Sequence, residues 1–414
     1  MRPALSTLVL MLPLAAAAAT PLQVLHWWTS ASERRAVEVL AAHAAAEDIA
    51  WRDAAVPGGA GQGAGKVLRS RVLAGDAPDA TQIIGRSIAD WAEVGVLLEL
   101  DNVAGTWPQQ LLPPVAALLR HRGHTVAAPL GIHRANALYL HKPTFDRLGL
   151  KAPTNWAELE RTVAALKAAG VVPLAQSSEP WQVAGLAEAM ILAEGGVALH
   201  RALFVRHDPA AAADPRLATA LRRLRQLRGW IGGAAVDRPW TDEVRRLQRG
   251  EAAMLLMGDW AKGELLALGA RLDQDVVCST WPGTQRQHLY SIDSLGMFTN
   301  DYARSPAQER LARLLVSPAV QADYNAVKGS VPVRRDTDPA RLDTCARDSW
   351  LSFAQGAAQR APSMVHRMAT DEASKEALVD ELRRFFLDEQ ATPASLQQRL
   401  AAVLRTLPQR ATDD

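Results

Sequence analysis

The chain has 414 residues, of which 48% are hydrophobic and 22% are charged, so it can form a globular protein with two domain-sized cores. Its formal net charge is +2, and it contains no long basic run. These features exclude the electrostatic footprint of a protein that binds nucleic acid or an anionic membrane.

The first twenty residues, MRPALSTLVLMLPLAAAAAT, have the pattern of a secretory leader. They combine one arginine, a short Leu/Val/Met-rich core and a run of alanines that matches a small-residue cleavage site. We therefore assign residues 1–19 to a cleaved signal peptide and expect a soluble exported protein. We predict no membrane insertion by any later segment. An uncleaved anchor is the alternative.

After the leader, short apolar runs alternate with amphipathic segments, which indicates an α/β architecture. The first part of the chain predicts strands and helices in alternation, at 22–27, 32–47, 49–56, 66–75, 80–85 and about 87–96. The pattern then restarts with a strand at 136–141 and helices at 154–170, 179–196 and through 222–227. A buried strand that ends at Gly258 leads into a helix near Trp260, and the tail from about Asp371 is predominantly helical.

No catalytic or metal-binding motif is present: HExxH, GxSxG and zinc-spaced Cys/His clusters are all absent. The histidine pair in HRGH, at 121–124, is expected to lie in a turn because Gly123 disfavours a helix. Scattered carboxylates leave room for a catalytic pair, so a sugar-cleaving enzyme is retained as the alternative function. The prediction is a protein that is not an enzyme and needs neither metal nor cofactor.

The chain has two cysteines, Cys278 and Cys345, and both lie in the part that would be exported. Oxidation is possible there, so we predict one disulfide between them. Two buried free thiols are the alternative, because the sequence does not give the distance between the two Cα atoms.

Six segments in order resemble an ABC-transporter solute-binding protein, and among these the glucose/mannose-binding subgroup of the carbohydrate receptors. They are LHWWTSASE (25–33), GDAPDATQIIG (75–85), DWAEVGVLLELD (90–101), a longer run at 120–160, MLLMGDWAKGE (254–264) and KGSVPVR (328–334). The resemblance implies a two-lobed periplasmic-binding-protein fold of type II with a ligand cleft between the lobes. It places residues 20–130 and 291–328 in the N-terminal lobe, and residues 131–290 and 329–414 in the C-terminal lobe.

The function that this resemblance implies is sugar binding for an ABC importer in the periplasm. We expect a monomer that closes on a neutral monosaccharide, first of all a glucose-like hexose, and presents it to the membrane permease. A receptor that serves a sensor, or that takes a modified sugar or polyol, is a further alternative.

Sugar chemistry gives a reason for the tryptophans, of which the chain has twelve against six Phe and four Tyr. A pyranose has apolar faces that stack on aromatic rings and a rim of hydroxyls that needs planar hydrogen-bonding groups. The family pattern places in the cleft Trp27, Trp28, Glu33, Trp260, Asp293, Lys328 and His366. Glu33 could instead cap its own helix, since Ser30 to Glu33 is a capping-box pattern. Trp260 could be a core residue, and His366 a surface or core histidine.

The chain also departs from its glucose-binding relatives. Ile84 takes the place of a family lysine, and Ser291 takes the place of an asparagine. Both changes remove long polar groups from the rim of the predicted pocket, which leaves sugar hydroxyls unmatched and predicts altered specificity. Arg86 could act as a substitute donor, and Arg134, near the first crossover, is a further candidate.

Overall fold

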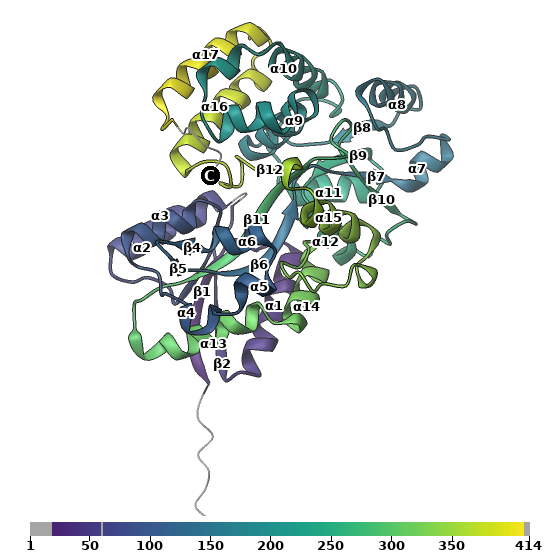
Figure 1. Cartoon of the computed structure of the whole chain (residues 1–414). Helices are drawn as coiled ribbons and strands as arrows, with labels where there is room; N and C mark the ends of the chain where they lie inside the picture. The colour runs from purple at the N-terminus through teal and green to yellow at the C-terminus, as the bar shows by residue number, and fades with distance from the viewer. Residues whose placement is uncertain (1–18, 59–60, 410–414) are drawn as a thin grey trace, which may run out of the picture.

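The computed structural model describes residues 19–58 and 61–409. The predicted signal peptide therefore lies outside the described residues, except for Ala19. The chain folds into two α/β lobes, as predicted, and Figure 1 shows one lobe around β1 and β2 and the other with the helices α9, α10, α16 and α17 at the top and β7, β8, β9 and β10 at the right.

The first lobe is built on a six-stranded sheet with the order β12-β11-β3-β1-β2, in which β6 pairs with the antiparallel β11. Strand β1 runs parallel to both β2 and β3, which fits the predicted alternation of strands and helices. The strands of this sheet are β1 (Thr20–His26), β2 (Ile49–Ala55), β3 (Ala80–Ile84), β6 (Ala128–Arg134), β11 (His288–Met297) and β12 (Arg360–Pro362).

The second lobe has a four-stranded sheet with the order β10-β7-β9-β8. Its strands are β7 (Ala137–His141), β8 (Val172–Ala175), β9 (Ala252–Met257) and β10 (Val276–Thr280). All six residues of β9 are buried, in agreement with the apolar run that predicted a buried strand before Gly258.

Helices cover both sheets (Figure 1). The first part of the chain supplies α1 (Ala31–Ala45), α2 (Gln62–Leu73), α3 (Ser87–Val94), α4 (Asp101–Ala104), α5 (Trp107–Gln110) and α6 (Pro113–Leu118). The middle supplies α7 (Lys142–Arg147), α8 (Trp156–Ala168), α9 (Pro180–Phe204), α10 (Pro215–Arg228), α11 (Trp240–Gln248) and α12 (Trp260–Ala267). The last part supplies α13 (Ser305–Leu315), α14 (Pro318–Lys328), α15 (Thr344–Gln355), α16 (Glu372–Leu387) and α17 (Pro393–Thr406).

The predicted turn in HRGH is confirmed. It joins the short antiparallel strands β4 (Arg120–His121) and β5 (His124–Thr125). Arg122 and Gly123 between them both have positive φ, 49° and 95°, as a two-residue hairpin turn requires.

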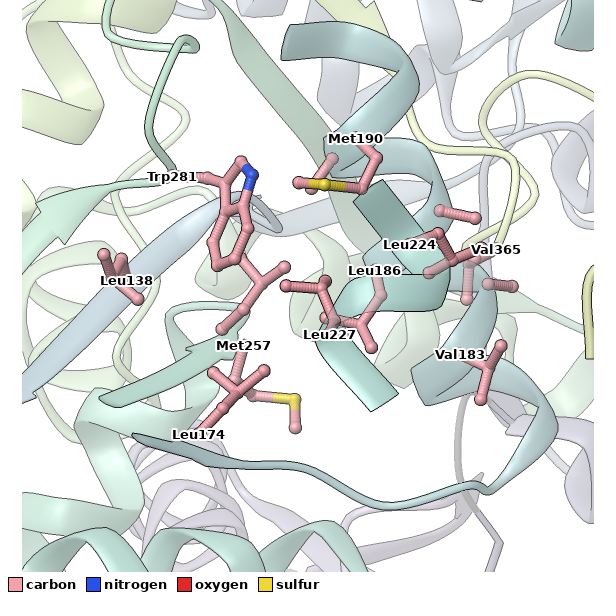
Figure 2. Close-up of a cluster of buried hydrophobic side chains, with 14 of the residues drawn as sticks. Leu138, Leu174, Val183, Leu186, Met190, Leu224, Leu227, Met257, Trp281 and Val365 are labelled. Carbon is pink, nitrogen blue, oxygen red and sulfur yellow. The ribbon is translucent and has the colours of Figure 1, made fainter. Parts of the chain in front are cut away.

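Each lobe has its own hydrophobic core. The core of the second lobe joins β7, β9 and α9 to the C-terminal helices, and Figure 2 shows Trp281 and Met190 within it. The core of the first lobe contains Val331, Val333, Trp350 and Phe353. Residues 331–353 lie beyond the predicted boundary at 328/329 but pack in the core of the first lobe, as does Met368, whereas Met364, Val365 and Ala369 pack in the second.

Helix α9 is long and apolar enough to cross a membrane by length and composition alone, although we predicted no such segment after the leader. In the fold, 67% of its apolar window is buried inside the protein. Its path is also interrupted at Gly196, whose φ of 66° is not helical. The apolar character of α9 is thus that of a core helix packed against α10 and α16.

The predicted disulfide between Cys278 and Cys345 is present, with 5.8 Å between the two Cα atoms. It ties β10, in the sheet of the second lobe, to the first turn of α15. Since α15 contributes to the core of the first lobe, the disulfide joins the two lobes.

Candidate functional site

A cavity of about 820 Å³ lies between the two lobes and is lined by residues from both. Its volume is in the range of small-molecule binding sites. The first lobe supplies Trp27, the start of α1, the end of β3 and the middle of β11. The second lobe supplies the starts of α9, α11 and α12. Helix N-termini thus surround the cavity, as they surround ligands in other α/β folds.

The tandem tryptophans have different environments. Trp27 lines the cavity and is partly buried, with the Arg367 guanidinium carbon 5.5 Å from its ring centroid. Trp28 is 1% exposed and packs on His26 and Tyr324 in the core of the first lobe. Adjacent side chains in extended backbone point to opposite sides, so only one of the two indoles can face the cleft. Trp28 is not among the residues that line the cavity, so its predicted contact with a ligand stays a prediction that this geometry does not favour.

Glu33 caps its own helix, and its contact with a ligand stays a prediction. Its Oε2 accepts hydrogen bonds from the backbone amides of Thr29 (3.0 Å) and Ser30 (3.1 Å), which completes the capping box of α1. It also lines the cavity. Lys328 does not line the cavity. Its buried Nζ lies 3.2 Å from Glu33 Oε1, so Lys328 contacts the glutamate of the cavity wall and not the cavity itself.

Asp293 lines the cavity from β11, where it pairs in register with Ile84 of β3. Its Oδ2 accepts a hydrogen bond from Gln82 Nε2 at 3.1 Å and lies 3.4 Å from His133 Nε2. The other ring nitrogen of His133 lies 2.5 Å from Asp259 Oδ1. A buried histidine thus bridges a carboxylate of the first lobe and one at the start of α12, in the second.

The contacts between His133 and the two carboxylates determine the protonation states of His133 and Asp293. Burial alone would lower the pKa of His133, but the carboxylates of Asp259 and Asp293 outweigh burial and raise it to about 9. Burial acts to raise the pKa of Asp293, whereas the hydrogen bond and charge of His133 and the charge of Lys328 bring it below its ordinary value. Asp293 is therefore an ionised hydrogen-bond acceptor at neutral pH.

Trp260 is the aromatic centre of the cavity. Its ring lies 6.3 Å from Trp181, 5.5 Å from His133 and 5.0 Å from His366, measured between ring centroids. Gly258 permits this placement, because a Cβ at that position would lie 2.2 Å from the Trp260 ring. The indole is 8% exposed and belongs both to the core of the second lobe and to the cavity wall.

His366 lines the cavity as a neutral acceptor. Burial first, and then the charges of His133 and Arg367, lower its pKa to about 3. Ser363 Oγ donates its proton to Glu188 at 2.8 Å, so it can only accept from His366 Nδ1, which lies 3.0 Å away. The proton is then on Nδ1, and Nε2 is the acceptor.

Among the cavity-lining residues of the second lobe that the sequence analysis missed are four with aromatic or acidic side chains. They are Glu179, Trp181, Trp240 and Glu264. Two signals could have found them: Pro-Trp begins both α9 and α11, and Glu264 lies one helical turn after Trp260 on the same face of α12. Glu264 also connects the lobes, because its Oε2 accepts the backbone amide of Ser32 at 3.0 Å.

Two of the remaining candidates lie away from the cavity. Arg86 precedes α3, and its backbone amide donates to Arg367. Arg134 follows His133 on β6, so its side chain leaves the opposite face of the strand and lines a different cavity. Neither residue is among the described residues that line the cavity, so the predicted ligand contacts of both stay predictions that this geometry does not favour.

Ile84 and Ser291, the two departures from the glucose-binding pattern, both line the cavity. Ser291 Oγ and Glu264 Oε1 are buried and have no hydrogen-bond partner among the described residues. Buried polar atoms are normally paired, so these two atoms are available to a ligand with hydroxyl groups. The wall around them offers acceptors, one aromatic cluster and an apolar edge at Ile84.

Comparison with known proteins places this arrangement in a family. Residues 30–284 match the bacterial extracellular solute-binding proteins. The chain belongs to this family. It is 36% identical over 385 residues to a probable sugar-binding periplasmic protein of Brucella suis, a match that covers 92% of this chain and 91% of the relative. A protein of the same description from Rhizobium meliloti is 35% identical and matches 94% of this chain and 95% of its own.

The solved structures agree on the fold of this solute-binding protein. The bacterial solute receptor AcbH, which has an exclusive preference for β-D-galactopyranose, superposes with a TM-score of 0.80 over 94% of this chain and 98% of its own. The two sequences are 16% identical, so the likeness concerns the fold alone. The relatives of this chain are solute-binding proteins, and its two-lobed α/β architecture is that of its family.

Proposed function

We propose that this solute-binding protein is the periplasmic sugar receptor of an ABC importer and binds a neutral monosaccharide by closing its two lobes. A glucose-like hexose is the first choice. The observation that carries the proposal is the pairing, in one interlobe cavity, of a tryptophan cluster with buried polar atoms that lack partners. The names of the relatives from Brucella suis and Rhizobium meliloti support sugar as the ligand class.

Each side chain has a defined part in this proposal. Trp260 stacks against the apolar face of the pyranose, with Trp27 on the opposite side of the cleft. Asp293, Glu264 and His366 Nε2 accept hydrogen bonds from hydroxyls, and Ser291 Oγ can donate or accept one. A ligand whose rim consists of hydroxyls satisfies these groups, because each hydroxyl donates one proton.

The cavity is divided between the lobes, so binding couples to closure. A ligand that contacts Asp293 from one lobe and Trp260 from the other stabilises the closed arrangement over an open one. The closed form would then be presented to the permease subunits in the membrane. Catalysis, metal and cofactor have no part in this function.

The test is a calorimetric titration of the mature protein with glucose, mannose, galactose and xylose, followed by the same titration of Trp260→Ala. The proposal expects saturable binding of at least one neutral sugar and a weaker interaction in the variant. Failure of every sugar to bind, with a folded protein, would refute it.

The alternative, a sugar-cleaving enzyme, requires a carboxylic acid that is protonated at neutral pH. Asp293 cannot serve, because His133 and Lys328 hold its pKa below the ordinary value. Incubation of the purified protein with disaccharides separates the two functions. Release of monosaccharide that is lost in Glu264→Gln would favour the enzyme.

A further inference from the structure

A second cavity, of about 440 Å³, lies on the other face of β6 from the sugar cavity. His133 and Arg134 are consecutive residues of this strand, so their side chains point to opposite faces. His133 lines the first cavity and Arg134 lines the second. The two cavities have no lining residue in common.

Arg134 is the notable residue of the second cavity. Its side chain is 6% exposed, and its Nε has no hydrogen-bond partner among the residues that the structure describes. Ser349, also on the cavity wall and 3% exposed, has an Oγ that is likewise unpartnered within the described part of the chain. Buried polar groups without partners are costly, so both groups indicate a polar occupant.

The charges around Arg134 leave its guanidinium incompletely matched. Burial lowers the pKa of Arg134 to about 10, and the nearby carboxylates of Asp259 and Asp348 do not compensate for it. Asp259 is engaged by His133 Nδ1 and by the backbone amide of Arg134. The second cation in the cavity, Lys262, is already paired with Asp343 at 2.8 Å. The carboxylates of Asp273 and Asp348 also line this cavity, and among its lining cations Arg134 is the one left to meet an anionic ligand.

The rest of the wall carries hydroxyl groups. They come from Ser279, Thr280, Thr344, Ser349 and Ser352. Hydroxyls can donate to and accept from the hydroxyls of a ligand. The disulfide between Cys278 and Cys345 forms part of the same wall, so β10 and α15 are held together around the cavity whether or not the lobes close.

We propose that this cavity is a second ligand site that binds a small hydroxycarboxylate, with its carboxylate on the Arg134 guanidinium and its hydroxyls on the serine and threonine wall. The planar guanidinium matches a carboxylate through two parallel hydrogen bonds. A monoanion is favoured over phosphate, because the carboxylates of Asp259, Asp273 and Asp348 on this wall repel each negative charge that a ligand carries. The site is independent of the sugar site that we propose between the lobes.

The experiment is a calorimetric titration of the mature protein with lactate and gluconate at constant ionic strength, with chloride as the reference anion. We expect saturable binding of one carboxylate per chain. Arg134→Gln should weaken it roughly tenfold or more, since a hydrogen bond to a charged group is lost. Arg347→Gln is the matched control: Arg347 is an exposed arginine of α15 outside both cavities, and its replacement should leave carboxylate binding unchanged.

A second variant allows the proposal to be tested even if Arg134→Gln does not fold. Ser352→Trp fills the cavity from α15 and keeps the guanidinium, so it should also abolish carboxylate binding. The proposal is overturned if neither probe binds, or if binding survives in both variants. It is also overturned if Trp260→Ala, in the first cavity, abolishes carboxylate binding, because the probe would then occupy the sugar site. Since the readout is carboxylate binding, it does not depend on whether any sugar binds.

Discussion

Replacement of Trp28 and Trp260 by alanine should separate stability from ligand affinity. Trp28 is 1% exposed and packs on His26 and Tyr324, whose ring centroids lie 5.0 and 6.1 Å away. Its truncation leaves a cavity in the core of the first lobe, for which we expect a loss of roughly 3–5 kcal/mol in the free energy of unfolding. The affinity of the folded fraction for sugar should change little, because the indole does not reach the interlobe cavity.

Trp260→Ala should mainly reduce affinity. The indole forms the cavity wall together with Trp181 and His366, and truncation of such a desolvated aromatic contact costs roughly 2 kcal/mol or more in binding. That energy corresponds to about a thirtyfold increase in Kd. Some stability is also lost, because Trp260 belongs to the core of the second lobe.

The assay is chemical unfolding followed by circular dichroism, combined with calorimetric titration of the best-bound sugar under conditions in which each variant is folded. The conservative variants Trp28→Phe and Trp260→Phe are the matched controls, and each should show a smaller effect of the same kind. The reasoning is refuted if Trp28→Ala weakens binding more than Trp260→Ala does. It is equally refuted if Trp260→Ala binds sugar within about twofold of the parent.

Three further outcomes are expected. Replacement of both Cys278 and Cys345 by alanine should lower the free energy of unfolding by about 4 kcal/mol in the chain-entropy model, since the bond closes a loop with a sequence separation of 67; two alkylatable thiols in the exported protein would contradict the bond. Stability should be greatest near pH 6.5. Above pH 6.5, His133 loses its proton in the unfolded chain before it does so in the folded protein, where its pKa is about 9, and this lowers the free energy of unfolding by up to about 3 kcal/mol. Below pH 6.5, His366 is protonated in the unfolded chain but stays neutral in the folded protein until about pH 3, and this also lowers the free energy of unfolding. Urea unfolding from pH 4 to 9 measures both limbs, and His133→Gln should flatten the alkaline one. Ile84→Lys should tighten glucose binding roughly tenfold by restoring a donor beside Asp293; a parent that already binds glucose at micromolar Kd or better, and is not improved by lysine, would show that the loss is compensated.

The sequence determined the features that depend on local pattern. Periodicity predicted the alternation of strands and helices, because a buried strand such as β9 and an amphipathic helix such as α1 each carry a distinct spacing of apolar residues. The capping box of Glu33 was readable because both of its partners lie within four residues. Two cysteines also allowed only one intrachain disulfide.

The tertiary structure decided which of the predicted site residues meet. Trp27 and Trp28 are equivalent as sequence letters, and only the direction of the backbone after β1 places one in the cleft and the other in the core. His133 and Arg134 are separated in the same way by the two faces of β6.

Contacts between residues far apart in the chain could not be predicted from the sequence either. Glu264 meets the start of α1 across 232 residues, and residues 331–353 return to the first lobe after the predicted boundary. Such contacts leave no periodic signal, because they depend on how distant elements pack and not on the residues next to them in the chain. The charge of His133 has the same origin, since it depends on two carboxylates that belong to different lobes.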